Sequence, residues 1–507
     1  MLNAIYKSIY RSKNIEFLRQ PKSSRNSELT QRLFAITHFS TDIAATMPKT
    51  SLDKSKLRRH GNSGLPSKKS GKHRHGAAAV LFSLCLPSTG QAAENTAITL
   101  YGVIDVALGY ARHGLSADPY FTSGLDGIPV PKSNHPVVAM IPSAIEGSRW
   151  GIKGTEKISD ESSAYFILES AFNPPSGVLT NSPQSTLNAG SATNPANSYG
   201  DSSLAGQLFG REAVLGLRHK HWGDLSIGRN KSFGIDAISK TDPMGGSQAY
   251  SPLGFNGAYA GGGDTADARQ DNSMKYTVRL TPEFSAGMLY AFGEKAGSMK
   301  NSSAQQLMLS YETPRFTAIG TYQRKYDSAS VSGKTAGQSI ALSFYDTESY
   351  LLGISYKFDT WTAKAGYERI SFATPDNSAT YYRTTYTSYF GLPVGAWNSG
   401  GTNAGKKLDV FWAGASLPLS DALDFGLAYY RIQQNDYSAS TCQVNSYKCS
   451  GSQNFLSSRL EYNFSKATNL YFGLLYTKLL GGAAYGPSSP YLYDNNLYVT
   501  TGIRHRF

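Results

Sequence analysis

The sequence contains no run of 18 apolar residues, so no segment is long and apolar enough to cross a membrane as a helix. It also lacks the short motifs of common enzyme classes: HExxH, GxSxG, and the phosphate-binding GxxxxGK followed by Ser or Thr. His219 and His221 stand in an expected turn, where hydration is a sufficient explanation for them. The sequence therefore gives no sign of an enzyme, a metal site or a cofactor.

The main part of the chain also lacks a net charge. The formal net charge is +13, but residues 1–93 hold 16 Lys or Arg against 4 Asp or Glu. The remaining residues therefore carry 33 basic and 32 acidic groups. Because the basic excess belongs to a leader, it provides no argument for nucleic-acid binding by the body of the protein.

Residues 68–93 have the three regions of a secretory signal peptide. The basic stretch KKSGKHRH precedes the apolar stretch GAAAVLFSLCL, which is followed by the small and polar stretch PSTGQAA. We expect cleavage after Ala92 or Ala93. A transmembrane anchor is the alternative, but this apolar stretch is too short to span about 30 Å of hydrocarbon.

The rest of the leader is less informative. Cys85 does not indicate a lipoprotein signal, because Leu84 precedes it where a small residue is expected. Residues 1–67 are rich in Ser, Lys and Arg and show weak periodicity. They are either a disordered extension or an overlong gene start, since Met47 offers an internal start; the sequence leaves both open.

Cys442 and Cys449 are the only cysteines of residues 94–507, and both lie in the polar stretch CQVNSYKC. Export to an oxidising compartment would join them in a disulfide that closes a small loop. A zinc site would need further ligands, and none stand nearby. The disulfide is the favoured interpretation.

From residue 98 to residue 507, apolar side chains recur at every second position, as in β-strands. The 33 tyrosines favour strands, and the 50 glycines suit turns. Any β-sandwich or barrel has one apolar face per strand, so this pattern alone does not place the protein in a membrane. In the first expected strand, one face carries Ile98, Leu100, Ile104, Val106, Leu108 and Tyr110, and the other carries Tyr101, Val103 and Asp105.

Connections between the expected strands alternate between short and long, which gives 16 strands. This is the layout of an antiparallel up-and-down membrane barrel, with short turns at the periplasmic side and long loops outside. Closure requires the last strand, at 497–507, to pair with the first, because an open edge in lipid leaves backbone groups unpaired. The short turns are at 159–162, 219–223, 281–283, 313–315, 359–360, 418–421 and 465–468. The long loops are at 111–145, 174–207, 232–268, 294–303, 328–346, 374–406, 435–453 and 480–494.

Aromatic residues near strand ends favour the membrane location. Tyr356, Phe358, Trp361, Phe464 and Tyr476 are placed as the interfacial girdles of a membrane barrel would be. Each could singly be a core aromatic of a soluble β protein. The mean hydropathy of −0.34 is compatible with a barrel whose lumen and loops are polar.

The third long loop, at 232–268, interrupts the strand pattern for 37 residues and contains the run GGGD at 261–264. Loops of this length inside an ordered domain are usually functional or disordered. We expect this loop to fold into the lumen of the barrel and to narrow it.

Eight stretches, taken in order, carry a family resemblance: ITLYGVIDVALGY, SRWGIKGTEKI, ILESAFN, LFGREAVLGL, LSIGRN, NSMKYT, LYAFGE and the C-terminal LYVTTGIRHRF. Together they resemble the trimeric general-diffusion porins of Gram-negative outer membranes, of the type common in β-proteobacteria. The resemblance covers residues 94–507 and none of residues 1–75.

The resemblance implies a 16-stranded barrel in the cell outer membrane, with a constriction loop folded into the pore. It also implies a homotrimer in contact with outer-membrane lipids and lipopolysaccharide, and passive diffusion of small hydrophilic solutes and ions. In the family, a C-terminal Phe is read by the outer-membrane assembly machinery, and Phe507 fits that role.

Family porins set basic wall residues against acidic loop residues at the constriction. Arg149, Arg211 and Arg229 match wall positions, and Arg269 is a looser match. Candidates for the acidic side are Asp236, Asp242, Asp264 and Asp267, without a residue-by-residue match.

The residues themselves support an inward-facing basic wall. Arg149 and Lys153 alternate with Trp150 and Ile152, and a charge facing lipid costs about 2–4 kcal/mol at the bilayer midplane. The two basic side chains are therefore expected in the lumen.

The neighbouring pair Arg211 and Glu212 is harder to place. If the two alternate, one of them faces outward, and a trimer interface could receive Glu212. Arg459 and Glu461 share an expected inner face. All of these charges could also be ordinary lumenal groups with little influence on transport. The basic wall outnumbers the acids that can be matched, which weakly favours anions.

Two other functions compete with a general porin. A substrate-specific channel would keep the barrel and add a ladder of aromatic or basic side chains in the lumen. A secreted soluble β-rich adhesin would instead bury its apolar faces between two stacked sheets.

Overall fold

The computed structural model describes residues 96–113, 135–175, 177, 179, 208–255, 268–294, 296–332, 340–373, 388–389, 392–398, 405–437, 450–482 and 493–507. They belong to one compact unit, Thr89–Phe507. The predicted leader, the predicted disulfide between Cys442 and Cys449, and the candidates Asp264 and Asp267 lie outside the described residues. None of the helices in these ranges is both long and apolar enough to span a membrane.

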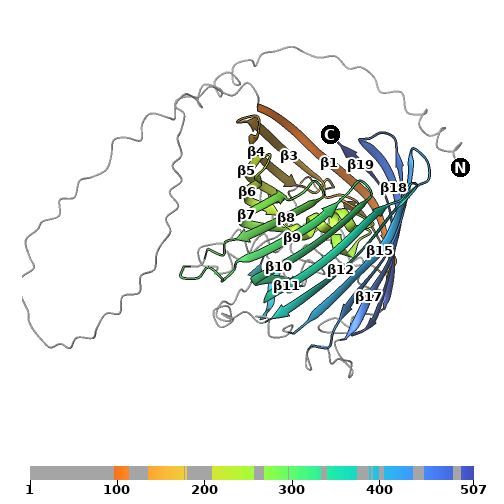
Figure 1. Cartoon of the computed structure of the whole chain (residues 1–507). Helices are drawn as coiled ribbons and strands as arrows, with labels where there is room; N and C mark the ends of the chain where they lie inside the picture. The colour runs from red at the N-terminus through yellow and green to blue at the C-terminus, as the bar shows by residue number, and fades with distance from the viewer. Residues whose placement is uncertain are drawn as a thin grey trace, which may run out of the picture. The chain divides into compact units, whose positions relative to one another are not determined.

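Within these ranges, sixteen strands form one continuous antiparallel wall that curves into a barrel (Figure 1). The barrel closes where β1 pairs with β19, with Val103 opposite Arg506 and Ala111 opposite Tyr498. The predicted closed 16-stranded barrel is therefore confirmed. The wall strands are β1 (Thr96–Ala111), β3 (Arg149–Lys157), β4 (Ser162–Ala171), β5 (Glu212–His219), β6 (Gly223–Lys231), β7 (Arg269–Arg279), β8 (Phe284–Ala291), β9 (Ala304–Glu312), β10 (Phe316–Ser332), β11 (Ile340–Lys357), β12 (Thr362–Ala373), β15 (Lys407–Pro418), β16 (Leu423–Gln434), β17 (Gly451–Asn463), β18 (Thr468–Gly481) and β19 (Asn495–Arg506).

One position in the wall is shared by two strands. β2 (Val137–Pro142) pairs with the second half of β1, and β3 pairs with its first half. β2 and β3 are thus two halves of one broken strand. The intervening residues 143–148 leave the sheet and lie inside the lumen.

The loop boundaries differ from the prediction in three places, the first of which is β2, since it lies inside the expected loop 111–145. β10 and β11 extend well into the stretch 328–346, which was expected to be a loop. Within the expected loop 374–406, β13 (Ser388–Tyr389) pairs with β14 (Leu392–Asn398), and β14 pairs in parallel with β11. Period-two patterning requires one lipid-facing side, so strands that continue beyond the membrane lack the signal used to find them.

The two faces of each strand are confirmed in β1. Leu108 is 54% exposed on the outer surface, whereas Ala107 is 3% exposed and points inward. Ile98, Leu100, Ile104 and Tyr110 are exposed with Leu108. A soluble protein with two stacked sheets is therefore the wrong architecture, because the apolar faces point away from the interior of a single closed sheet.

Aromatic side chains gather at the ends of strands, as predicted, except that Tyr476 lies inside β18. The rings of Phe358 and Trp361 stack with centroids 4.1 Å apart, and Tyr356 lies 4.6 Å from Phe358. Tyr462 and Phe464 meet in the same way at 5.1 Å, beside the turn at 464–467. These clusters stand at short-turn ends of the strands, where an interfacial girdle belongs.

The C-terminal residue completes the closure of the barrel. The Phe507 amide donates to the Gly102 carbonyl at 3.1 Å, and the Gly102 amide donates to the Phe507 carbonyl at 2.9 Å. The Phe507 ring covers the outer side of Gly102 so closely that a side chain at position 102 would overlap it. The chain end is thereby fixed to the first strand.

Candidate pore constriction

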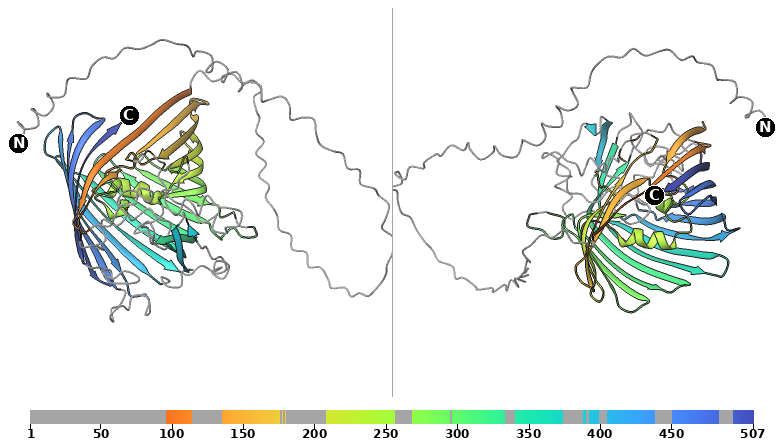
Figure 2. Two further views of the ribbon diagram at one scale, coloured as in Figure 1. Left: turned by 180° about the vertical axis from the view of Figure 1, so that it is seen from behind. Right: turned by 90° about the horizontal axis from the view of Figure 1, so that it is seen from above.

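The third long loop enters the barrel, as predicted, over its described residues 232–255 (Figure 2). It contains α3 (Phe233–Thr241), whose first turn is capped by Ser232 accepting the Ile235 amide at 3.2 Å, and α4 (Pro252–Phe255). The buried face of α3, which includes Phe233 and Ile238, packs against the inner surface of β9–β12. The helix therefore occupies part of the lumen cross-section.

Glycines on the inner wall make room for this loop. A Cβ atom at Gly287 would lie 2.5 Å from the Phe233 ring, and one at Gly473 would lie 2.5 Å from the Tyr250 ring. Both distances are shorter than any ordinary contact, so side chains at these glycines would push the loop further into the pore. The inner-wall glycines beneath the loop are Gly287 on β8, Gly353 on β11, Gly414 on β15, Gly426 on β16 and Gly473 on β18.

Asp242, at the C-terminal end of α3, anchors the loop to the wall. Its carboxylate accepts hydrogen bonds from the Tyr430 hydroxyl at 2.5 Å and from the amides of Met244 and Gly246 at 3.1 and 2.6 Å. The Trp412 indole donates to the neighbouring Thr241 carbonyl at 3.0 Å. Asp242 is fully buried. The prediction that its charge faces the aqueous pore is therefore wrong.

The far end of the described loop reaches the opposite side of the barrel. The Tyr250 hydroxyl forms a hydrogen bond with the Thr500 hydroxyl on β19. The Tyr250 backbone carbonyl accepts a hydrogen bond from the Ser457 hydroxyl at 2.5 Å. The Ala249 amide donates to the Ala144 carbonyl at 2.7 Å. The loop is thus hydrogen-bonded to the segment between β2 and β3.

That segment, residues 143–148, is a second element inside the lumen. One Asp105 oxygen accepts the amides of Ile145 and Glu146, both at 2.8 Å, and the other accepts the Tyr471 hydroxyl at 2.5 Å. Asp105 is itself fully buried. Because its carboxylate satisfies backbone groups that left the sheet, Asp105 holds Glu146 in its place beside the pore.

Glu169 on β4 organises the predicted basic wall. Its carboxylate contacts Arg211 Nε at 2.6 Å and Arg149 Nε at 3.4 Å, and it accepts the Tyr101 hydroxyl at 3.1 Å. The side chains of Arg149 and Arg211 remain 21% and 16% exposed. The structure therefore brings together two of the predicted arginines with a carboxylate that the prediction did not include.

The basic surface continues across the closure of the barrel. Glu146 lies 3.3 Å from Arg506 and 3.9 Å from Arg504, and Glu461 contacts Arg504 and Arg459 at 2.7 Å each. The expected inward position of Arg459 and Glu461 is confirmed. We call these described residues the arginine patch, in which five guanidinium groups meet three carboxylates: Arg149, Arg211, Arg459, Arg504 and Arg506 with Glu146, Glu169 and Glu461.

Arg229 and Arg269 are buried and bond the backbone of the turn that carries Arg211. They are 7% and 6% exposed, and their Nε atoms donate to the carbonyls of Gly210 and Arg211, both at 2.6 Å. Arg229 also pairs with Asp271. These two predicted residues thus hold the turn that carries Arg211, instead of facing solutes.

The remaining predicted charges, Lys153 and Asp236, do not belong to the arginine patch. Lys153 is exposed on the inner face of β3, with its Nζ 5.1 Å from the centroid of the Tyr101 ring. Asp236 on α3 contacts Lys275 Nζ of β7 at 2.7 Å. The acidic loop therefore meets a basic wall residue, but the partner is Lys275 and not one of the predicted arginines.

The expectation that Arg211 and Glu212 take opposite faces is wrong. β5 begins at Glu212, so Arg211 belongs to the preceding turn and does not alternate with it. Glu212 stands directly opposite Glu169 in the sheet and points inward, where it contacts Lys231 Nζ at 2.7 Å. Neither residue needs a place on the outer surface.

Several residues of the site were missed by sequence reasoning. Arg504 and Arg506 carried a usable signal, because they alternate with Ile503 and Phe507 of the last strand and must therefore point inward. Glu169 was missed because no basic residue stands near it in the sequence to indicate an ion pair. Glu146 lies in a segment that leaves the sheet, so period-two patterning could not place it.

A closed antiparallel barrel with an apolar outer face, narrowed from within and lined by charges, is the architecture of a membrane diffusion channel. Comparison with known families agrees, since the family described as Gram-negative porin matches residues 77–481. The chain belongs to the Gram-negative porin family. It is an outer-membrane channel for diffusion and not an enzyme.

Individual relatives match this chain over nearly their whole length. An outer membrane porin protein of Bordetella pertussis is 28% identical over 448 residues, which cover 85% of this chain and 98% of that protein. Outer membrane porin protein 32 of Delftia acidovorans is 22% identical, over 83% of this chain and 97% of that one. Among solved structures, the anion-selective porin from Comamonas acidovorans superposes with a TM-score of 0.55 at 20% identity, covering 81% of this chain and all of that one. This last likeness supports the fold.

Replacing Asp105 with Ala tests the second lumen element. The change removes three hydrogen bonds and leaves two backbone amides unpaired, at about 1–3 kcal/mol for each unsatisfied group. We expect single-channel recordings to show noisier current than the wild type, because residues 143–148 become mobile. Tyr471→Phe removes one of the three bonds and should have a smaller effect. Identical current noise in Asp105→Ala and wild type would contradict the role of Asp105.

Proposed function

We propose that the channel passes small hydrophilic solutes with a preference for anions, and that the arginine patch sets this preference. Transport is passive: solutes cross down their gradients, limited in size by the loop that enters the lumen and sorted by charge at its surface. The observation that supports this proposal is the excess of two guanidinium groups over carboxylates in the patch. No step requires a cofactor.

The excess charge is large enough to matter. Two unit charges 4 Å apart interact by about 1 kcal/mol in bulk water and about 4 kcal/mol at an effective dielectric constant of 20. A difference of about 1 kcal/mol changes an ion's equilibrium occupancy roughly fivefold. The same sign of selectivity is stated for the porin of Comamonas acidovorans.

The roles within the wall differ. Arg149 and Arg211 are partly exposed and act directly on passing ions, and Lys153 acts on ions at the short-turn side of the patch. Arg229 and Arg269 act by holding the turn that carries Arg211. On the loop, Asp236 contributes the acidic side and Asp242 the anchor; Asp264 and Asp267 remain candidates outside the described residues.

The double variant Arg149→Gln, Arg211→Gln tests the proposal. Removing two cations leaves equal numbers of arginines and carboxylates in the patch, so the reversal potential in a salt gradient should move toward the cation side. Arg369→Gln is the matched control, because Arg369 lies on the outer face of β12, pairs with Asp409 there, and is half exposed.

An unchanged reversal potential in the double variant would show that other residues sort the ions. The same bilayer experiment separates a general porin from a substrate-specific channel. Flux that rises linearly with solute concentration supports a general porin, whereas saturation by one solute supports a specific channel.

The mature protein is proposed to be a homotrimer of residues 94–507, made after removal of the signal peptide at 68–93, with a disulfide between Cys442 and Cys449. Mass spectrometry of the protein purified from outer membranes tests all three. The denatured mass should correspond to a start at residue 93 or 94, less two hydrogens before reduction. The native mass should be three times larger. A mass that retains residues 1–67 would refute removal of the leader, and a free thiol pair would refute the disulfide. A monomeric native mass would refute the homotrimer.

Phe507 is proposed to serve as the assembly signal, supported by its terminal position and its pairing with Gly102. Deleting Phe507 should lower the amount of heat-modifiable, folded barrel in the outer membrane and raise the amount in the periplasm. Phe507→Tyr keeps an aromatic ring and should retain assembly. Normal assembly of the deletion variant would argue against this role.

A further inference from the structure

The ring of Tyr101 lies against the inner wall of the barrel, beside the arginine patch. Tyr101 on β1 stands directly opposite Gly151 on β3. A Cβ atom at Gly151 would lie 2.8 Å from the hydroxyl end of the ring, so the glycine lets the ring lie flat on the strand. The Tyr101 hydroxyl donates to Glu169 at 3.1 Å, which fixes the direction of the ring. The side chain stays partly exposed.

Two cations flank this ring on the inner face of β3. Arg149 and Lys153 are each two positions from Gly151, about 7 Å along the strand to either side. Lys153 Nζ lies 5.1 Å from the centroid of the Tyr101 ring and forms no ion pair with any residue that the structure describes. Arg149 uses Nε and Nη1 for contacts within the wall, and its Nη2 donates to none of the described residues. Both cations therefore have donors left for an anion.

The carboxylates beside the ring already have cations of their own. Glu169 contacts Arg211 Nε at 2.6 Å. Glu212, opposite it on β5, contacts Lys231 Nζ at 2.7 Å. Glu146 contacts the two arginines of the last strand. The charge that remains beside the ring is therefore positive.

A second tyrosine of the inner wall, Tyr165 on β4, has the same packing but no available cation. Its ring lies over Gly216, as that of Tyr101 lies over its own glycine. The Arg218 guanidinium carbon lies 4.8 Å from the centroid of the Tyr165 ring. Arg218 also contacts the Asp224 carboxylate at 2.8 Å, and this carboxylate accepts the Tyr165 hydroxyl at 2.5 Å. The cation beside Tyr165 is thus neutralised, whereas the one beside Tyr101 is not.

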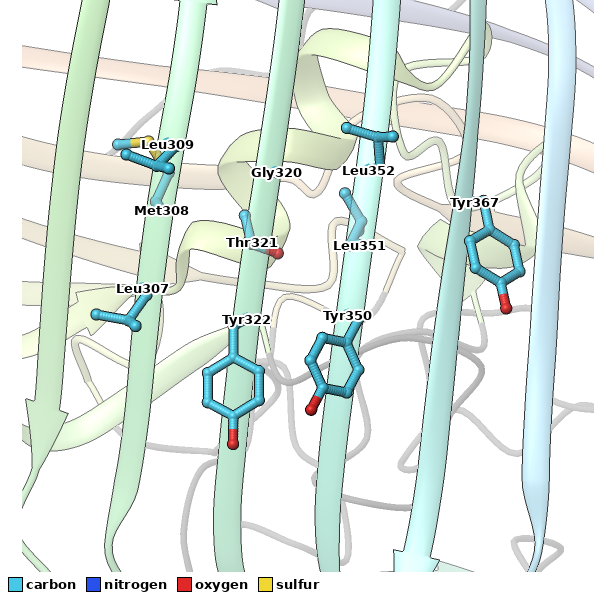
Figure 3. Close-up of a pocket in the computed structure, with 10 residues that line it drawn as sticks. All are labelled: Leu307, Met308, Leu309, Gly320, Thr321, Tyr322, Tyr350, Leu351, Leu352 and Tyr367. Carbon is cyan, nitrogen blue, oxygen red and sulfur yellow. The ribbon is translucent and has the colours of Figure 1, made fainter.

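Aromatic rings on the outer face of the barrel do not meet solutes in the pore. Tyr322 on β10 and Tyr350 on β11 lie side by side there, with ring centroids 5.0 Å apart (Figure 3). They share this face with the exposed Leu352. Tyr101 belongs to the opposite face of the sheet, which also carries the arginine patch. Its ring is therefore within reach of a solute that passes the patch.

We propose that Tyr101, Arg149 and Lys153 form a platform that favours aromatic carboxylates over other organic anions. The ring of the solute stacks on the lumen-facing side of Tyr101 in an offset arrangement. Its carboxylate accepts from Arg149, or from Lys153 once this flexible side chain leaves the tyrosine ring, since a cation–π contact at an exposed site is weak. Binding must itself be weak, because a channel has to release its solute. The inference rests on the proposed anion preference and names the class of anion that it serves best.

Block of the KCl current by two matched dicarboxylates tests the platform. Terephthalate and its trans-hydrogenated cyclohexane analogue carry the same charges at similar spacing, but only terephthalate is aromatic. In planar bilayers, terephthalate should halve the single-channel current at a concentration about threefold lower, or less. Cyclohexane is the more apolar of the two rings, so apolar contact alone would give the opposite order.

Variants assign the preference to the ring and the affinity to the cations. Tyr101→Leu removes the ring but still covers Gly151, and should bring the two blocking concentrations together. Tyr101→Phe keeps the ring and should keep the preference. Lys153→Gln should weaken block by both solutes several-fold and leave their ratio unchanged. Tyr165→Leu is the matched control and should behave as wild type.

Two outcomes would overturn the platform: equal block by the two solutes in the wild type, or a preference for terephthalate that survives in Tyr101→Leu. If Tyr101→Leu does not fold, as judged by heat-modifiable migration, Tyr101→Met serves with the same expectation. The reversal potential in a KCl gradient, measured in the same bilayers, tests the anion preference separately. A wild type that prefers anions but blocks equally with both solutes refutes the platform alone, whereas a wild type that prefers potassium refutes the proposed function.

Discussion

Backbone amides and carbonyls in hydrocarbon have no water to bond, so each must find its partner inside the protein. The pairing of β1 with β19, completed by Phe507 on Gly102, is what satisfies this constraint here. Once the sheet is sealed, every strand has one face toward lipid and one toward the interior. The alternation of side chains and the position of the aromatic residues follow from that single closure.

A sealed wall can be narrowed only from within, and two chain segments do so. Both depend on buried carboxylates that bond backbone amides: Asp242 in the third loop and Asp105 beneath residues 143–148. These two acids serve the architecture and present no charge to solutes. Arg149 and Arg211 of the arginine patch remain partly exposed to the lumen. The residues that shape the pore are therefore largely different from those proposed to sort ions.

The sequence was sufficient for the existence and order of the sixteen wall strands, the short turns and the entry of the third loop, because alternation and loop length are local signals. It was insufficient where partners are distant: Tyr471 lies 366 positions from the Asp105 carboxylate it contacts. It failed for Arg211 because the start of β5 was placed four residues early. The buried positions of Arg229 and Arg269 depend on turn carbonyls whose location only the folded chain defines.

Oxygen accessibility of nitroxide labels along β18 tests the closed membrane barrel most directly. Single labels at positions 470–477, in a variant with Cys442 and Cys449 replaced by Ser, would be measured by electron paramagnetic resonance in lipid vesicles. The barrel predicts high collision rates with lipid-dissolved oxygen at Leu470, Phe472, Leu474 and Tyr476, and low rates at the four positions between them. A profile without this period of two, or with its maxima at the inward positions, would contradict the barrel.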